Sequence, residues 1–189
     1  VPSLIDLILN SNDLTPYNLR SLRRVFFCGE PLLKRHVIGL FKAKKTIKII
    51  NTYGPTEATV SCTYKQINFK NIVSNPDPSI AIGKAIKGMK IQLTENGKIS
   101  KKSGEIIIYG EQLASGYLNK KDNKNKFYFP KNKVAFFRSG DYAIVKKGEM
   151  YFKNRIDNQV KVKGHRIELE EINANIRSLG PGNVTTVVY

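Results

Sequence analysis

The feature that most constrains the fold is an early strand-helix-strand pattern. Residues Arg24–Cys28 (RVFFC) are apolar enough for a short buried strand, which ends at Gly29. Pro31 suits the first turn of a helix, where its missing N–H is not needed, and apolar side chains recur at helical spacing over Leu32–Phe41. Thr46–Ile50 then predicts a second strand. A β-α-β unit favours a parallel sheet that binds ligands at the carboxyl ends of its strands.

The second strand runs directly into a rigid polar corner, Asn51–Val60 (NTYGPTEATV). Pro55 fixes its own φ, lacks a backbone donor and biases the preceding glycine toward extended geometry. The corner therefore presents the ring of Tyr53, the hydroxyl of Thr56 and the carboxylate of Glu57 at the end of a strand. The alternative is a plain turn whose polar residues face water.

Beyond a polar, proline-rich stretch at 68–79, predicted to be a loop, the pattern changes to short strands. Turn dipeptides at 96–97, 103–104 and 147–148 separate these strands, which predicts antiparallel hairpins and a small barrel. A short surface helix is predicted at 119–126. After an extended segment at 58–66, the predicted strands are Met89–Leu93, Ile99, Glu105–Tyr109, Val134–Phe137, Tyr142–Val145 and Met150–Lys153.

A polar stretch at 154–159 ends the hairpin series. Beyond it, the pattern predicts a strand with alternating lysines, an amphipathic helix over Glu168–Leu179 with acidic residues in its first turn, and a final strand from 184. We therefore predict an α/β fold: a parallel β-α-β sheet portion, a small antiparallel β-barrel-like subdomain, and the start of an α+β C-terminal domain. The predicted boundary separates residues 1–156 from 157–189.

The net charge of +17 raises the hypothesis that the protein binds nucleic acid. Most of the excess is lysine scattered through loops, with no arginine-rich helix and no regular interleaving with aromatic residues. A lysine-rich solvated surface explains this pattern, and it still attracts anionic ligands or an acidic partner protein. We expect no nucleic-acid partner.

Two cysteines without a pairing pattern argue against a disulfide framework or a zinc site and fit a reducing cytosol. No apolar stretch approaches the roughly 20 residues that cross a bilayer. The opening residues do not have the pattern of a signal peptide, so we do not expect one there. We expect a cytoplasmic protein, and we expect both ends of the sequence to be cuts in a longer chain.

Four separated segments together resemble the adenylate-forming enzymes, a superfamily of nonribosomal peptide synthetase adenylation domains, acyl-CoA synthetases and luciferases. Their order and approximate spacing match the family. The segments are NTYGPTE at 51–57, GEIIIYGEQLASGYLN at 104–119, FRSGDYA at 137–143 and NRIDNQVKVKGHRIELEEI at 154–172.

The resemblance implies a two-step reaction. Enzymes of this superfamily use ATP to join a carboxylate to AMP with release of pyrophosphate, and then pass the acyl group to a thiol, usually a phosphopantetheine arm. No protein nucleophile is needed, because the substrate carboxylate attacks the α-phosphorus. The protein positions the ligands, binds Mg²⁺ and stabilises phosphate charge.

The resemblance also implies residue roles in ATP binding. Tyr53 would stack on adenine, Thr56 would donate to a phosphate oxygen, and Glu57 would bind Mg²⁺. Asp141 would accept hydrogen bonds from the ribose hydroxyls, and Arg155 would lie near ribose and phosphate. The alternatives are an Asx-type turn at Asp141 and a surface salt bridge at Arg155. The rest of the predicted nucleotide set is Gly29, Glu30, Asn51 and Thr52.

By the same resemblance, Asp157 matches the residue about which the small C-terminal domain rotates between the two steps. Gly164 matches a glycine that lines the tunnel for the thiol arm; the alternative is an ordinary hairpin glycine. Glu105 and Tyr117 belong to a segment that we interpret as architectural. His36 and His165 have no recognisable nucleophile partner, so we assign neither a base role.

The acyl pocket is predicted from its similarity to D-alanine:carrier-protein ligases, which FFCGE followed by NTYGPTEATV closely resembles. A cysteine at position 28 would confine a small substrate, so a small amino acid, first of all D-alanine, is expected; the alternative is that Cys28 is a small buried hydrophobe. The partner would be a phosphopantetheinylated carrier protein. The predicted pocket residues are Phe26, Cys28, Thr52, Val60 and Ser61.

Three functional elements of the superfamily fall outside the sequence. The phosphate loop and the aspartate that grips the substrate amino group would lie upstream, and the catalytic lysine would lie beyond Tyr189. We therefore expect the 189 residues to be inactive alone. Two other functions remain open: an acyl-CoA or aryl-acid ligase, and a non-catalytic basic module that binds nucleic acid.

Overall fold

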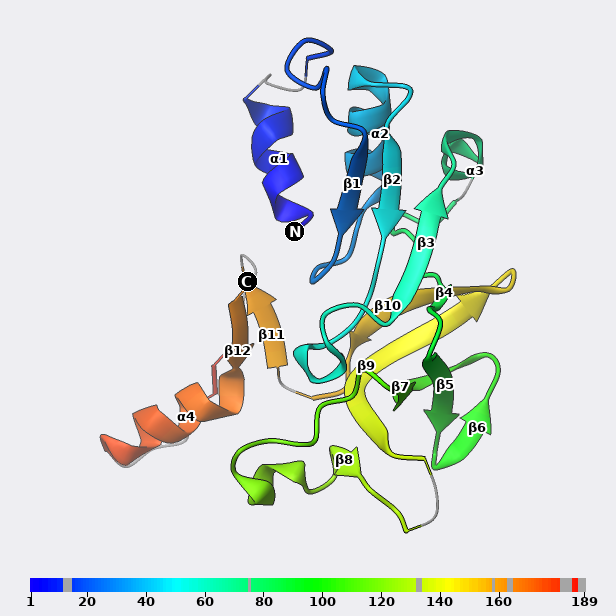
Figure 1. The fold of residues 1–189 in the computed structure, drawn as a ribbon. Coiled ribbons are helices and arrows are strands. Elements are labelled where there is room, and N and C mark those ends of the chain that lie inside the picture. The colour runs from blue at the N-terminus through cyan, green and yellow to red at the C-terminus, as the bar shows by residue number, and fades with distance from the viewer. Residues whose placement is uncertain are drawn as a thin grey trace.

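The structure is a computed structural model that describes residues 1–11, 15–74, 76–131, 134–157, 159–162, 165–180 and 185–186. A four-stranded sheet, a six-stranded antiparallel sheet and a two-stranded hairpin follow one another along the chain. Figure 1 shows the first sheet and its helices beside the curled antiparallel sheet, with the loop after β2 reaching from one to the other. The predicted fold class is confirmed.

The predicted strand-helix-strand unit is present. Strand β1 pairs with β2 in parallel, and the order of the first sheet is β1-β2-β3-β4. Buried apolar side chains of the helices and strands form the first core. The elements are α1 (Ser3–Asn10), β1 (Arg24–Phe27), α2 (Lys34–Ala43), β2 (Lys48–Asn51), β3 (Thr63–Ile67) and β4 (Lys84–Ala85).

Helix α2 begins at Lys34, two residues after the predicted start. The ring of His36 explains the shift, because its Nδ1 accepts a hydrogen bond from the backbone N–H of Leu33 at 3.3 Å and so caps the first turn. The other ring nitrogen lies 2.9 Å from Asp6 Oδ1 of helix α1. His36 therefore joins two helices, as expected of a structural histidine.

The prediction of a loop throughout 68–79 is wrong over α3 (Phe69–Val73). Asn68 caps this short helix by accepting a hydrogen bond from Lys70 N at 3.0 Å. Packing then stabilises it, because Ile72 is buried in the first core and the Phe69 ring lies edge-on to Phe41 at 5.3 Å. Tertiary contact outweighs the polar composition of the stretch.

The second part of the chain forms the antiparallel sheet, ordered β10-β9-β7-β5-β6, with β8 also paired to β9. Buried apolar side chains of this sheet form a second core together with Ala58 and Cys62. The strands are β5 (Met89–Glu95), β6 (Lys98–Ser100), β7 (Ser103–Gly110), β8 (Phe127–Tyr128), β9 (Phe136–Lys146) and β10 (Glu149–Arg155). A 3₁₀ helix, η2 (Lys120–Asn123), replaces the surface helix predicted at 119–126.

Two strands predicted around residues 134–137 and 142–145 are one bent strand, β9, and no turn interrupts it. Gly140, within RSGD, has a φ of +73°, and the register against β7 shifts between Glu105 and Ile107. A β-bulge of this kind bends a strand and redirects a side chain. The alternative of an Asx-type turn at Asp141 is therefore wrong.

Strands β11 (Gln159–Val162) and β12 (His165–Glu168) form the C-terminal hairpin, followed by α4 (Leu169–Ser178). The predicted amphipathic helix is confirmed, and the final predicted strand lies largely outside the described residues. The change of sheet after β10 falls at the predicted boundary between 1–156 and 157–189, which stays a prediction. None of the described helices is long and apolar enough to cross a membrane.

Candidate active site

The corner after β2 connects the two cores. Ile49 in β2 belongs to the first core, whereas Ala58 and Cys62 belong to the second. The corner is closed by hydrogen bonds to Tyr53 O from the backbone N–H groups of Cys62 at 2.8 Å and of Thr63 at 3.0 Å. Burial raises the pKa of Cys62 to about 12, so this thiol is a core group. The corner is thus a rigid bridge at the carboxyl end of β2.

Gly54 makes the closure possible. A Cβ at this position would lie 2.7 Å from Val60 O and 2.9 Å from Cys62 N, so only glycine allows the returning chain so close. Pro55 then leads into the 3₁₀ turn η1 (Thr56–Ala58). Thr56 is exposed at this turn, while Glu57 is only 5% exposed.

A hydrogen bond joins the corner to the bulge of β9. Tyr53 Oη donates to Asp141 Oδ2 at 2.5 Å, across 88 residues of sequence. Burial raises the pKa of Tyr53 well above its ordinary value, and the neighbouring Asp141 carboxylate raises it further. The residues expected to bind adenine and ribose are therefore in direct contact.

Arg155 extends this contact into an ion-pair network. Its Nη1 donates to Asp141 Oδ1 at 2.7 Å, and its Nε and Nη2 each donate to Asp157 at 2.6 Å. Lys126 Nζ donates to Asp157 Oδ2 at 3.1 Å. The alternative of a surface salt bridge at Arg155 does not fit, because its side chain is 14% exposed.

The network of Asp141, Arg155 and Asp157 depends on charge attraction and on the room left by a glycine. Burial alone would raise the pKa of Asp157, but its hydrogen bonds with Arg155 and Lys126 outweigh burial and lower it to about 2. A Cβ at Gly140 would lie 2.6 Å from Asp157 Oδ2 and 2.8 Å from Arg155 Nη2. Gly140 therefore provides the bulge and the room for the ion pair together.

A cavity of about 320 Å³ lies between the two sheets, bounded by the corner, the bulge and β11. Asn51 contributes a buried carboxamide whose Nδ2 donates to Ala81 O at 3.0 Å. Within the described part of the chain, Asn51 Oδ1 has no hydrogen-bond partner. Thr56, predicted to contact a phosphate, and Glu57, predicted to bind the metal, are not in the lining of this cavity. Its lining includes the other residues predicted to bind nucleotide: Gly29, Glu30, Asn51, Thr52, Tyr53, Asp141 and Arg155.

Glu30 also has a partner outside the cavity. Ser3 at the start of α1 donates to its carboxylate through the backbone N–H at 2.9 Å and through Oγ at 3.1 Å. The carboxylate of Glu30 thus fixes the N-terminus of α1 beside the carboxyl end of β1.

Glu57 is the candidate for binding Mg²⁺. Its carboxylate accepts a hydrogen bond from Tyr117 Oη at 2.5 Å. Among the described residues, no group of three or more His, Cys, Asp or Glu side chains could hold a metal ion. A single carboxylate such as Glu57 is enough for Mg²⁺, which takes one or two protein carboxylates and fills its octahedron with water and substrate phosphates.

Four residues predicted for the acyl pocket form a connected polar cluster. Ser61 Oγ donates to Thr52 Oγ1 at 3.0 Å and lies 3.7 Å from Cys28 Sγ, which donates to Val60 O at 3.3 Å. Thr52 belongs to this cluster and also lines the cavity. Phe26, the fifth residue predicted for the pocket, lies on β1 and is 63% exposed.

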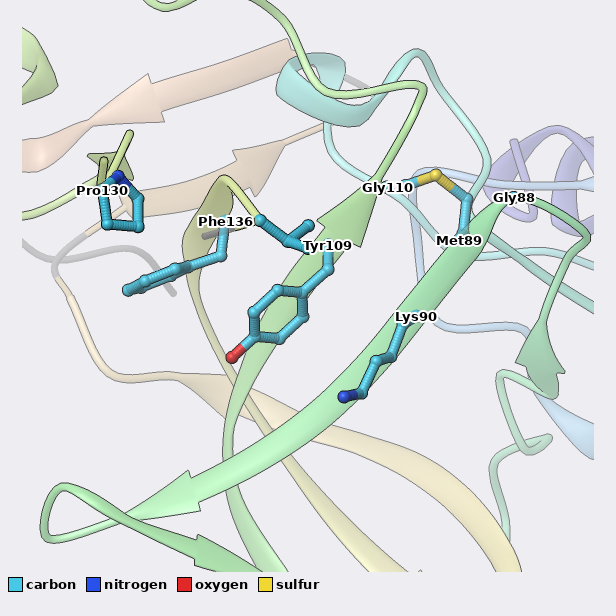
Figure 2. Close-up of a pocket in the computed structure, with 8 residues that line it drawn as sticks. Gly88, Met89, Lys90, Tyr109, Gly110, Pro130 and Phe136 are labelled. Carbon is cyan, nitrogen blue, oxygen red and sulfur yellow. The ribbon is translucent and has the colours of Figure 1, made fainter. Parts of the chain in front are cut away.

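A second cavity, of about 590 Å³, lies on the antiparallel sheet away from the predicted residues. Figure 2 shows Lys90, Tyr109 and Phe136 lining it, and Lys90 Nζ lies 5.4 Å from the centre of the Tyr109 ring. Its described lining residues include no carboxylate. Glu30, Asp141 and Arg155 line the first cavity instead.

Two contacts at the site were missed by sequence reasoning. Tyr117, interpreted as architectural, donates to Glu57, and Lys126 pairs with Asp157. Tyr117 stands in one of the four matching segments, which was the available signal, whereas Lys126 is one lysine among many. Glu105 fits the architectural interpretation, because it pairs with Arg138 and accepts from Gly140 N. Gly164 lies outside the described residues.

Comparison with known proteins identifies the family. The sequence profile of the AMP-binding enzymes matches residues 1–118. The chain belongs to the AMP-binding enzyme family. This AMP-binding chain is 35% identical over 180 residues to the D-alanine–D-alanyl carrier protein ligase of Listeria monocytogenes serotype 4a, covering 94% of this chain and 35% of the relative. The Staphylococcus epidermidis protein of the same name is 34% identical over 176 residues, covering 93% and 34%.

Solved structures agree with the fold of this AMP-binding chain. The Vibrio cholerae adenylation domain AlmE, in complex with glycyl-adenosine-5′-phosphate, matches at 34% identity and a TM-score of 0.81, covering 94% of this chain and 34% of that one. PA1221, an NRPS protein containing adenylation and PCP domains, matches at 29% identity and 0.78, covering 93% and 36%. The chain spans about a third of the length of its curated relatives.

Proposed function

We propose that the chain is part of an ATP-dependent adenylate-forming ligase that activates a small amino acid, first of all D-alanine. The observation that carries the proposal is the cavity that gathers Tyr53, Asp141 and Arg155. Glu57 follows in the 3₁₀ turn of the same corner. Three segments widely separated in the sequence converge there on one set of aromatic, anionic and cationic groups. A nucleotide presents a matching set: a base, a ribose and phosphates.

In this proposal the residues act by binding and orientation. The Tyr53 ring packs against adenine, and Asn51 Oδ1 provides a buried acceptor for a nucleobase donor. A carboxylate offers about four lone-pair sites, so Asp141 can accept from ribose hydroxyls while Tyr53 and Arg155 hold it. Arg155 adds positive charge next to the ribose.

The phosphates would lie at the exposed end of the corner. The hydroxyl of Thr56 would donate to a phosphate oxygen, and Glu57 would hold Mg²⁺, whose chemistry when bound is to supply positive charge to the phosphates. The substrate carboxylate attacks the α-phosphorus, so a P–O bond forms to the acyl oxygen as the bond to pyrophosphate breaks. No residue needs to act as a covalent nucleophile.

The substrate proposal rests on the polar cluster around Cys28 and on the names of the relatives. In this proposal Cys28, Val60 and Ser61, which hydrogen bonds join to one another, would bound the space for a short side chain, and Phe26 on β1 would contribute to it. The relatives are named as ligases of D-alanine, and AlmE was solved with glycyl-adenosine-5′-phosphate, another small aminoacyl adenylate.

The second step would transfer the aminoacyl group to the phosphopantetheine thiol of a carrier protein. The relatives named as carrier protein ligases and the adenylation and PCP domains of PA1221 support such a partner. Asp157 would serve as the hinge between 1–156 and 157–189, and Gly164 would line the thiol tunnel. The 189 residues alone would not catalyse adenylation, because they span about a third of the relatives.

The decisive experiment is amino-acid-dependent exchange of pyrophosphate into ATP by the full-length protein. A panel of D- and L-amino acids, fatty acids and aryl acids is tested, with the isolated 189 residues assayed in parallel. Exchange stimulated most by D-alanine is expected. Stimulation by only a fatty or aryl acid would make the protein an acyl-CoA or aryl-acid ligase, and salt-dependent DNA or RNA binding without ATP affinity would favour a nucleic-acid-binding module.

A further inference from the structure

The loop between β7 and β8 holds the carboxylate of Glu57 from the opposite side of the corner. Tyr117 Oη donates to Glu57 Oε1 at 2.5 Å, across 60 residues of sequence. Glu57 is 5% exposed, and the Tyr117 ring packs against the second core. The hydrogen bond therefore lies in shielded surroundings, where an electrostatic contact is stronger than in water.

Tyr117 is itself held in place by contacts on both sides of its backbone and ring. Its backbone N–H donates to Asn123 Oδ1 at 2.7 Å, and its ring lies edge-on to Phe127 at 5.2 Å and 78°. Gly116 has a φ of +110°, and a Cβ there would lie 2.8 Å from the Asn123 carboxamide. The hydroxyl is thus a donor with a fixed position.

The same loop also holds the backbone of the 3₁₀ turn. Ala114 N donates to Glu57 O at 2.9 Å, and Thr59 Oγ1 donates to Gln112 O at 2.8 Å. Backbone and side chain of Glu57 are therefore both attached to one loop. Rotation of the carboxylate is limited by Tyr117, and displacement of the turn is limited by the two other contacts.

We propose that Tyr117 is a positioning residue for Mg²⁺ binding: its hydroxyl fixes the plane of the Glu57 carboxylate and so the direction in which that carboxylate meets the cation. The inference rests on the proposed function, which assigns the metal to Glu57. Groups that orient a metal ligand typically affect metal affinity by about 10- to 100-fold. A fixed neutral donor at Oε1 has the chemistry of such a group.

The test is Tyr117→Phe in the full-length protein, which removes the hydroxyl and keeps the ring on Phe127. Mn²⁺ serves as the probe, and unbound Mn²⁺ is measured by electron paramagnetic resonance in the presence of ATP. We expect Mn²⁺ affinity to fall about 10-fold, while ATP affinity measured without metal stays unchanged. Raising the Mg²⁺ concentration should restore the pyrophosphate exchange rate.

Two further variants complete the test of the positioning role of Tyr117. Tyr109→Phe is the matched control, because Tyr109 Oη donates to Gln92 Oε1 at 3.0 Å on the antiparallel sheet, away from Glu57. It should leave Mn²⁺ affinity unchanged. Asn123→Ala removes the side chain that holds Tyr117 N, and it should weaken Mn²⁺ binding in the same direction even if Tyr117→Phe folds poorly.

Glu57→Gln separates the inference from the function on which it rests. If Glu57→Gln leaves Mn²⁺ affinity unchanged, the metal role of Glu57 fails and the positioning role fails with it. If Glu57→Gln weakens Mn²⁺ binding and both Tyr117→Phe and Asn123→Ala do not, the function stands and the positioning role is overturned. Equal losses of metal-independent ATP binding in the Tyr117 and Asn123 variants would show a general structural role and would also overturn it.

Discussion

Two parts of the molecule contribute to the site in different ways. One is the first sheet, β1–β4, called here the parallel part after its β1–β2 pair, although β3 and β4 join it antiparallel. The other is the antiparallel part, β5–β10. The parallel part presents the aromatic, hydroxyl and carboxylate groups on neighbouring residues, 53–57, at the end of one strand. The antiparallel part supplies Tyr117 as the partner of Glu57 and Asp141 as the partner of Tyr53, and Arg155 pairs in turn with Asp141. One region therefore provides the chemical groups of the site, and the other fixes their directions.

The two regions also differ in the interactions that stabilise them. Backbone hydrogen bonds close the corner around Tyr53, whereas side-chain ion pairs join Asp141, Arg155 and Asp157. Backbone geometry is insensitive to pH and salt, but ion pairs respond to both. Variants in the antiparallel part therefore provide the best means to change the orientation of the site's side chains without changing the chemical groups that the corner presents.

The largest effect is expected for Asp141→Ala, which removes the acceptor shared by Tyr53 and Arg155. Each charge-assisted hydrogen bond lost to the ribose should reduce ATP affinity by about 1.5–3 kcal/mol. Isothermal titration of ATP into the full-length protein measures the effect. Tyr142→Phe is the matched control in β9, because Tyr142 Oη pairs with Glu95 on the sheet surface. Unchanged ATP affinity in Asp141→Ala would contradict the ribose role.

Gly140→Ala should lower stability by about 2–3 kcal/mol, more than backbone strain alone, which costs roughly 1–2 kcal/mol at positive φ. The added Cβ would lie 2.6 Å from the Asp157 carboxylate and force the network apart. Gly148→Ala is a close control, since Gly148 has a φ of +76° and its Cβ would meet nothing within 4 Å. Equal urea midpoints for the two variants would show that the ion pair does not depend on this space.

The contribution of Asp157 should depend on pH. Its folded-state pKa of about 2 lies below the ordinary value of 3.8, so its stabilisation is present above pH 4 and is lost as the pH falls toward 2. Asp157→Asn should therefore be less stable than the parent by up to about 2 kcal/mol at pH 6 and equally stable near pH 2. Urea unfolding at intervals between these values measures the difference. If the difference in unfolding free energy between Asp157→Asn and the parent stays constant from pH 6 to pH 2, the ion pair is not its cause.

The smallest effect is expected for Lys126→Met, because the Lys126 and Asp157 side chains are each 31% exposed. A partly exposed ion pair of this kind contributes about 1 kcal/mol or less, and salt screens it. The difference in unfolding free energy from the parent should shrink between low salt and 1 M NaCl. Lys124→Met, at an exposed neighbouring position, should show no such salt dependence.

Much of the fold was predictable because its signals are local. The apolar alternation of β1 and β2, the proline at the start of α2 and the turn dipeptides between later strands all act within a few residues. Errors arose where distant contacts decide. Packing of Phe69 and Ile72 stabilises α3, and pairing with β7 makes β9 continuous through Gly140.

The residue types of the site were predictable in the same way, but the residues that they contact were only partly predictable. The four matching segments identify Tyr53, Glu57, Asp141 and Arg155 as candidates, and all except Glu57 line one cavity. Tyr117 and Lys126 gained a place at the site only through contacts across 60 and 31 residues. A lysine-rich sequence gives no local reason to single out one lysine.

The family of the chain, the strand-helix-strand unit and the chemical groups at the corner after β2 could all be predicted from the sequence. Short-range rules suffice for these, since Gly54 and Pro55 shape the corner from within. The tertiary structure alone decided that Tyr117 orients toward Glu57 and that Gly140 makes room for Arg155 and Asp157. The physical reason is that hydrogen bonds and ion pairs depend on distance in space, which sheet pairing and core packing set.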